Sequence, residues 1–337
     1  MPAYPVTLGV EEEVFVLEKG RLTPTLQSLD YLRRLWWSDL KTYWATTHSN
    51  FARGEDRREC FMGSIEISTR VHDSVDALLD DLVARRTALA RAVRGGRVVP
   101  TGALFTLNSP SNTASTHIHV GVPTTERERV YRNLATFAPL FALASANSPY
   151  AAGRRCGLSY RLAQSSLIGP LRADPEYRFQ DLIISKRLGT VELRLCDPMP
   201  ELTRLRMVLR AVRAVASWGG SADFCPETYN HERKSWTIRG ETQYIQELRH
   251  KLERICEFDP SLSADTLSQR VGNIADERGI ESAYAKLDRI WREPTGVPVC
   301  PESTSAWRAA SGLLGYYALR VPWIAWKGYK EWYGKAS

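Results

Sequence analysis

Residues 10–14 read Val10-Glu11-Glu12-Glu13-Val14, and they decide the fold because three later segments repeat their pattern. In each segment an acidic or imidazole side chain recurs at every second position, between aliphatic residues. Side chains two residues apart share one face of a β-strand. Each segment therefore predicts a strand with one apolar face and one face that carries metal-ligating side chains. The three later segments are Ile65–Ser68, His117–Val120 and Val191–Leu195.

The electrostatics of these polar faces indicate bound cations. If the faces converge, several carboxylates lie a few ångströms apart, and two unit charges at 4 Å repel by about 4 kcal/mol at an effective dielectric near 20. Carboxylates with a minority of imidazole suit Mg²⁺ or Mn²⁺ better than a structural zinc. Mg²⁺ held by protein carboxylates is usually completed by water and substrate phosphates, so a nucleotide is the expected co-ligand.

Each segment taken alone also has a simpler interpretation. The acidic triplet would suit a solvated edge strand or ion pairs with arginines, and a single Glu66 or Glu192 would pair with an arginine by default. His117 and His119 would suit hydrogen-bonded core histidines. Four such strands in one chain favour a shared metal centre instead.

Composition bounds the classes of function. The chain has 337 residues, is 43% hydrophobic and 25% charged, and carries a formal charge of +7. Its Lys and Arg residues are dispersed, which favours a basic surface or a pocket for a polyanionic substrate over nucleic-acid binding. Its six cysteines form no C-x-x-C pair. With neither a secretory signal nor an apolar run of roughly 20 residues, we expect a cytoplasmic protein without membrane contact.

Periodicity predicts one domain over residues 1–321 followed by an aromatic, basic tail over 322–337. A first strand should end near Leu17, and another should cover 98–107. Residues 150–180 have little periodicity and predict a lid or substrate loop. A capping-box spacing at 125–128 predicts the start of a helix to about residue 146. Other helices are expected at 72–96, with Asp73 or Ser74 as cap, and at 201–218, 241–258, 264–278, 280–293 and 304–320.

The motifs, in their order along the chain, resemble those of the carboxylate-amine ligases of the glutamate-cysteine ligase type 2 family, in the glutamine synthetase superfamily. The resemblance covers roughly residues 9–197 and fades beyond about 240. It rests on Gly9–Glu13, Ile65–Thr69, Thr116–Gly121, Ala144–Tyr150 and Gly189–Asp197.

This resemblance implies an α+β fold in which a curved, mainly antiparallel sheet carries the active site on its concave face and helices pack on the other. It implies a ligase that uses ATP and Mg²⁺, with Mn²⁺ as an alternative, to join a carboxylate to an amine through an acyl phosphate. Glu192 and Arg194 would act in catalysis, with Arg194 meeting the transferred phosphoryl group. Basic residues near substrate or nucleotide would be Arg154, Arg161, Lys186 and Arg187. The implied metal ligands are Glu11, Glu13, Glu59, Glu66, His117, His119 and Glu192.

Departures from the family pattern leave the substrates open. Ile183 stands where the family usually has an arginine, and Arg155 stands where an acidic residue is common. The expected partners are a small carboxylate, with the γ-carboxylate of glutamate foremost, and cysteine or another small amine; a homo-oligomer stays open. Two alternatives remain: a metal-dependent hydrolase that uses the same carboxylates and histidines, and a non-catalytic nucleotide-binding member of the family.

Overall fold

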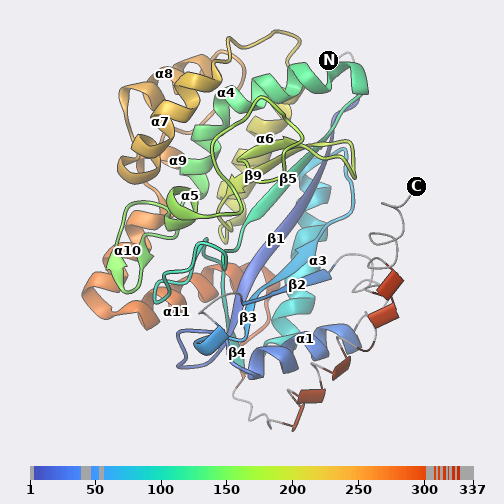
Figure 1. The fold of residues 1–337 in the computed structure, drawn as a ribbon, viewed down its shortest axis with the longest axis vertical. Coiled ribbons are helices and arrows are strands. Elements are labelled where there is room, and N and C mark those ends of the chain that lie inside the picture. The colour runs from blue at the N-terminus through green and yellow to red at the C-terminus, as the bar shows by residue number, and fades with distance from the viewer. Residues whose placement is uncertain are drawn as a thin grey trace.

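A curled antiparallel sheet forms the centre of the protein (Figure 1). The computed structural model describes residues 4–38, 47–52 and 57–300, together with scattered positions between 307 and 326. The strand order is β2-β3-β1-β5-β9-β8, and β4 pairs with the far end of β1. The strands are β1 (Thr7–Glu18), β2 (Thr47–Phe51), β3 (Met62–Ser68), β4 (Gly96–Val99), β5 (Thr116–Gly121), β8 (Leu182–Ile184) and β9 (Val191–Cys196), beside a small hairpin of β6 (Tyr150–Ala151) and β7 (Arg154–Arg155).

The four segments with alternating ligand residues are β3, β1, β5 and β9, and they are adjacent in the sheet. Their register brings the polar positions together, because Glu11 lies opposite His117 and Glu13 lies opposite Glu66. His119 of β5 lies opposite a glutamate of β9 in the same way. The strands predicted from the alternation are thus confirmed, as is the α+β class with a curved, antiparallel sheet.

Helices cover the other face of the sheet. Val10 and Val14 of β1 join Ile118 of β5 in a large apolar core that also contains side chains from α3, α4 and α6. In Figure 1, α7 and α8 lie beside α4, whereas α10 and α11 lie toward the end where β4 is. The helices are α1 (Gln27–Ser38), α3 (Val75–Ala92), α4 (Arg127–Ser145), α5 (Tyr160–Gln164), α6 (Leu202–Ser217), α7 (Pro226–Arg239), α8 (Gln243–Glu253), α9 (Ser261–Ala264), α10 (Leu267–Arg278) and α11 (Ile280–Arg292), with 3-10 turns η2 (Thr124–Glu126) and η3 (Glu293–Thr295).

A second, smaller core lies on the polar face of β1, at the end that pairs with β4. Phe15 and Leu17 continue the odd-numbered positions of Glu11 and Glu13, yet both are fully buried. They pack with Val99 of β4 and with residues of α10 and α11. This second core closes one end of the face that carries the ligand residues.

Several predicted elements have different bounds in the structure. The helix expected at 72–96 is α3, and Ser74 is its N-cap. The strand expected at 98–107 is wrong beyond Val99, where β4 ends. The predicted capping box is also wrong, because η2 precedes α4 and no side chain caps its N-terminus. The helix expected at 304–320 and the tail at 322–337 lie largely outside the described residues.

Helices α1 and α7 were not predicted, and neither were β2 and β8. Among the described residues, none of the helices has the length and apolar character needed to span a bilayer.

Candidate metal centre

Side chains from three neighbouring strands converge at one point of the polar face. Glu11, His117 and Glu192 each offer a ligand atom, and these atoms all lie within 4.8 Å of one another. His117 Nδ1 is 3.4 Å from Glu11 Oε2 and 3.6 Å from Glu192 Oε1. Strand register explains the convergence, since β5, which carries the histidine, lies between β1 and β9. The arrangement gives a divalent cation one imidazole and two carboxylate ligands.

The hydrogen bonds of Ser115 define which nitrogen of His117 faces the cluster. The Ser115 hydroxyl donates to Glu13 Oε2 at 2.6 Å and lies 2.9 Å from His117 Nε2. A serine has one hydroxyl proton, so His117 Nε2 must be the donor in the second contact. In the neutral ring this leaves the lone pair on Nδ1, which points toward Glu11 and Glu192. A second hydrogen bond that orients a ligating histidine in this way is typical of protein metal sites.

His119 completes the imidazole pair on β5. Its Nε2 is buried without a hydrogen-bond partner among the described residues and lies 3.5 Å from Glu11 Oε2. Its Nδ1 lies 3.1 Å from Thr190 Oγ1. Burial acts to raise the pKa of Glu11, but the adjacent His117 and His119 outweigh it and hold that pKa below its usual range. A buried ring nitrogen with no partner, next to a carboxylate, fits a site built for a cation.

Glu13 and Glu66 extend the negative charge along β1 and β3. Burial raises the pKa of Glu66 well above its usual range, and the charges of Glu11 and Glu13 raise it further. Glu13 also accepts a hydrogen bond from Asn50 Nδ2 at 3.1 Å. Crowded, partly buried carboxylates are stable as anions only with a counter-charge. The donor set therefore fits divalent cations with oxygen and nitrogen ligands.

Arg194 lies directly beside this cluster. Its Nη1 donates to Glu192 Oε1 at 2.8 Å, and its side chain is 12% exposed. Its Nε is buried without a hydrogen-bond partner among the described residues. Arg187 lies 4.0 Å from Glu11 Oε1 and is largely exposed. Two guanidinium groups therefore lie at the edge of the acidic cluster, where they could contact an anionic substrate.

The other predicted basic residues are placed differently. Arg161 is buried and donates to the backbone carbonyls of Arg194, Leu195 and Cys196. It thus holds the end of β9, and direct contact with a nucleotide stays a prediction. The exposed Lys186 pairs with Glu176 at 3.1 Å. Arg154 is exposed on β7.

Glu59 is not joined to the cluster. Its side chain is exposed, and its backbone carbonyl accepts a hydrogen bond from Thr23 Oγ1 at 3.0 Å. No hydrogen bond or ion pair within the described part of the chain connects its carboxylate to Glu11, His117 or Glu192. A ligand role for Glu59 stays a prediction.

Sequence reasoning missed Ser115 and Asn50, which orient the cluster. Ser115 precedes His117 by two residues, so it continues the same alternation and could have been placed on the polar face. Asn50 comes from β2, where His48 and Asn50 alternate but lack the aliphatic neighbours that mark the other four strands, so the sequence signal there is weak.

The expected lid is anchored at several points. In residues 150–180, the Leu171 amide and carbonyl both bond the Asn230 side chain of α7. Arg155 pairs with Asp276 of α10 at 2.7 Å. Ile183, which departs from the family pattern, has a buried side chain and lies opposite Glu192 in the register of β8 and β9. These contacts attach the segment to the surrounding helices, and a lid role stays a prediction.

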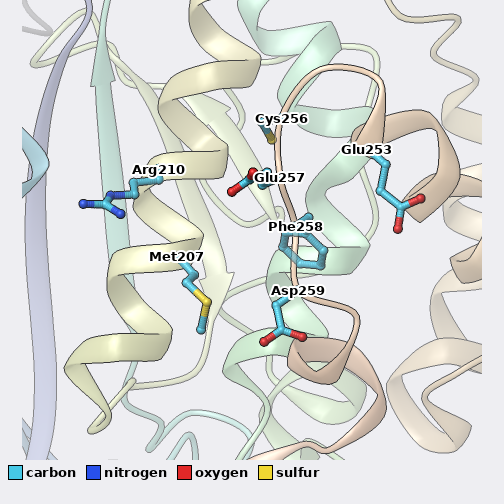
Figure 2. Close-up of a pocket in the computed structure, with 7 residues that line it drawn as sticks. All are labelled: Met207, Arg210, Glu253, Cys256, Glu257, Phe258 and Asp259. Atoms are coloured by element: carbon cyan, nitrogen blue, oxygen red, sulfur yellow. The ribbon is translucent and has the colours of Figure 1, made fainter.

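A hollow on the described residues lies away from this cluster. It measures about 780 Å³ and lies on the helical layer, between α6 and the segment that follows α8. In Figure 2 the guanidinium of Arg210 points away from the acidic side chains of this hollow, and it lies 3.8 Å from Asp76 on α3. The lining lacks paired histidines and does not include the sheet, so it contributes nothing to the metal centre. It is lined by Met207, Arg210, Glu253, Cys256, Glu257, Phe258 and Asp259.

Comparison with known sequences agrees with the resemblance found in the motifs. The chain is 27% identical over 283 residues to the "Putative glutamate--cysteine ligase 2" of Chromobacterium violaceum, an alignment that covers 67% of this chain and 71% of that protein. It is 29% identical over 211 residues to the "Putative glutamate--cysteine ligase 2-1" of Frankia casuarinae, and there it spans about half of that protein, 54%. No protein-family model matches the chain. The predicted similarity to type 2 glutamate-cysteine ligases is confirmed.

Solved structures show the same fold. A glutamate-cysteine ligase from Francisella tularensis, in complex with AMP, superposes with a TM-score of 0.59 at 10% identity and covers 95% of both chains. A bifunctional glutathione synthetase from Pasteurella multocida gives a TM-score of 0.53 at 10% identity, over 86% of this chain and 52% of that one. Both relatives in sequence and both neighbours in fold are named as enzymes that form carbon-nitrogen bonds.

Proposed function

We propose that this protein is an ATP- and Mg²⁺-dependent carboxylate-amine ligase. The single observation that carries the proposal is the convergence of Glu11, His117 and Glu192 from three strands, with Arg194 bonded to one of the carboxylates. The similarity to named glutamate-cysteine ligases supports the same reaction class. A nucleotide is the expected co-ligand because Mg²⁺ in a carboxylate site is usually completed by phosphate oxygens.

In the proposed reaction, a substrate carboxylate attacks the γ-phosphoryl group of ATP, which releases ADP and forms an acyl phosphate. An amine then attacks the acyl carbon, so that phosphate leaves and an amide forms. Glu11, His117 and Glu192 would hold one cation, and Glu13 and Glu66 would contribute to a second. When bound, the cations neutralise negative charge on the phosphates.

Arg194 supplies the complementary positive charge from the protein. Its guanidinium is fixed by Glu192, so it is oriented before substrate arrives, and orientation in advance is what makes electrostatic stabilisation effective. Phosphoryl transfer requires positioning and charge neutralisation more than covalent participation by the enzyme. The first carboxylate to test is the γ-carboxylate of glutamate, and the first amine is cysteine.

The test is a screen for ADP release over pairs of carboxylates and amines with Mg²⁺ present. We expect release that requires both substrates, and loss of at least about 100-fold in kcat for Glu192→Gln. The matched control is Glu247→Gln, since Glu247 is exposed on α8, remote from the cluster. Normal turnover by Glu192→Gln would refute the assignment.

A second candidate is a metal-dependent hydrolase, favoured by Glu11 beside His117 and His119, because two histidines and one glutamate are also a ligand set of catalytic zinc. Tightly bound zinc in the purified protein, with no affinity for ATP, would establish this alternative. Calorimetric ATP binding without turnover over a broad amine panel would instead identify a non-catalytic nucleotide-binding protein.

A further inference from the structure

Glu12 is a carboxylate on the wrong face of β1 for the metal centre. It lies between Glu11 and Glu13 in the chain, but alternation turns it into the large apolar core, between Val10 and Val14, where it is 1% exposed. A carboxylate buried in an apolar core is costly unless it is fully paired. Its partners therefore show why the residue is there.

Each hydrogen-bond partner of the Glu12 carboxylate, within the part of the chain that the structure describes, comes from outside the sheet. Arg86 of α3, itself fully buried, donates from Nε to Oε2 at 2.9 Å and from Nη2 to Oε1 at 2.5 Å. Trp291 of α11 donates its Nε1 proton to Oε2 at 3.1 Å. The result is a two-pronged ion pair with a third donor, a geometry more directional than a single salt bridge.

Arg86 extends this contact to the chain that leaves β9. Its Nη2 donates to the carbonyl of Met199 at 2.7 Å, and its Nη1 donates to that of Pro200 at 3.0 Å. Met199 follows β9 by three residues. Through one guanidinium, β1 is thus joined to the end of β9, although the two strands are separated in the sheet by β5.

We propose that Glu12 and Arg86 are positioning residues that set the spacing between β1 and β9, and with it the spacing between Glu11 and Glu192. The inference rests on the proposed function, because those two glutamates are its metal ligands. The strands contribute ligands from the polar face, while the pair acts from the apolar face, so it touches neither cation nor substrate.

A buried ion pair is weak evidence for stability, since apolar residues of similar volume are often equally stable or better. This fact separates positioning from stabilisation. In a variant with Glu12→Leu, Arg86→Met and Trp291→Phe, no charge is left uncompensated in the core, yet the connection between the two strands is gone. We expect this triple variant to fold and to bind metal poorly.

The experiment titrates Mn²⁺ alone into each protein and follows the free ion by electron paramagnetic resonance. We expect the Kd for Mn²⁺ to rise about 10- to 100-fold in the triple variant, as it does when residues that orient metal ligands are removed. The matched control replaces another buried ion pair with Asp288→Leu and Arg292→Met. Arg292 bonds Asp288 at 2.7 Å on α11 and does not contact Glu12 among its described partners.

The control should bind Mn²⁺ within about twofold of the native chain, as expected for sites without shared partners. If the triple variant does not fold, Arg86→Lys keeps both charges but cannot reproduce the bonds of the guanidinium to Glu12 and to the carbonyls of Met199 and Pro200, and it should weaken Mn²⁺ binding in the same direction by less. Native Mn²⁺ affinity in a folded triple variant, or in Arg86→Lys, would overturn the inference while leaving the proposed function intact. A native chain that binds no Mn²⁺ would overturn the proposed function, and this inference with it.

Discussion

Glu11 and Glu12 are adjacent in sequence, yet they lie in opposite environments. Glu12 is surrounded by donors, because Arg86 and Trp291 satisfy both of its oxygens in the core. Glu11 lies near other carboxylates. Among the described residues its carboxylate also lies close to the rings of His117 and His119, and the Arg187 guanidinium is farther away, at 4.0 Å. The same residue type on the same strand therefore serves packing on one face and, in the proposed function, ligand binding on the other. The difference indicates that a structural carboxylate is distinguished from a functional one by having a complete counter-charge, more than by how deeply it is buried.

The largest expected effect concerns the core face. Glu12→Gln leaves Arg86 buried without its charge partner, and breaking a buried pair in this way costs about 3–5 kcal/mol. Urea denaturation followed by circular dichroism measures the loss in free energy of unfolding. Glu11→Gln, its neighbour on the polar face, is the control and should change that free energy by less than about 1 kcal/mol. Equal losses in the free energy of unfolding in the two variants would contradict the contrast between the two faces of β1.

The next effect concerns the response to metal. Mn²⁺ at 100 times its Kd should stabilise the native chain by about 2.7 kcal/mol, because it binds only the folded state. Glu66→Gln removes a carboxyl group whose ionised form is disfavoured by burial and by Glu11 and Glu13, so the metal-free variant should be at least as stable as the native chain while the Mn²⁺-dependent gain is reduced. Thermal unfolding with and without Mn²⁺ measures both quantities. A full Mn²⁺ gain in Glu66→Gln would exclude Glu66 from the site.

A smaller effect is expected from the residue that orients His117. Ser115→Ala removes the acceptor of His117 Nε2 and a donor to Glu13, so the ring loses its fixed orientation. We expect Mn²⁺ affinity to fall about 10-fold, or 1.4 kcal/mol. Ser68→Ala is the control, since the Ser68 hydroxyl reaches Glu66 only at 3.5 Å. Unchanged affinity in Ser115→Ala would show that the hydrogen bond does not define the ligand nitrogen.

The smallest effect tests a carboxylate that belongs to neither face of β1. Burial acts to raise the pKa of Asp81, but bonds from His72 and the Arg70 amide, with Arg85 nearby, lower it overall. A lowered folded-state pKa adds stability above the unfolded pKa of about 3.9, and that stability is lost as the pH falls through the folded value. Asp81→Asn should therefore cost about 1 kcal/mol at pH 7 and less below pH 4.

The control for this prediction is Asp80→Asn, because Asp80 is the exposed neighbour on α3. Urea midpoints at pH 7 and at pH 3.5 give the comparison. A loss in Asp81→Asn that is independent of pH would mean that the carboxylate charge contributes nothing.

The sheet and most of the ligand cluster could be predicted because they depend on local alternation. Because side chains alternate with a period of two, the polar face of each strand can be assigned from that strand's own sequence, and Glu11, His117 and Glu192 each lie on such a face. Long amphipathic helices such as α3 follow for the same reason. The face of Glu12 could also have been read from that period, but its partners could not, because Arg86 and Trp291 approach from residues 74 and 279 positions away.

Errors arose where tertiary contacts override local signals. The run of apolar residues after Val99 packs in the second core without forming a strand, and the backbone N–H of Phe105 donates to the Tyr284 hydroxyl of α11. The sequence of α7 is polar, so apolar periodicity did not predict this helix. Its buried side chains include Tyr229 and Arg233, and both of them bond Asp181. Such a helix is stabilised by contacts with a partner residue elsewhere in the chain, and its own sequence has no apolar stripe from which to predict it.

The second core has a consequence for how molecules reach the cluster. Phe15 and Leu17 turn the same side of β1 that carries Glu11 and Glu13 from charged to apolar, and α10 and α11 close it there. The polar face of β1 is thereby closed at this end by buried apolar side chains. Under the proposed function, nucleotide and amino acid would both have to reach the cluster from the side away from this second core.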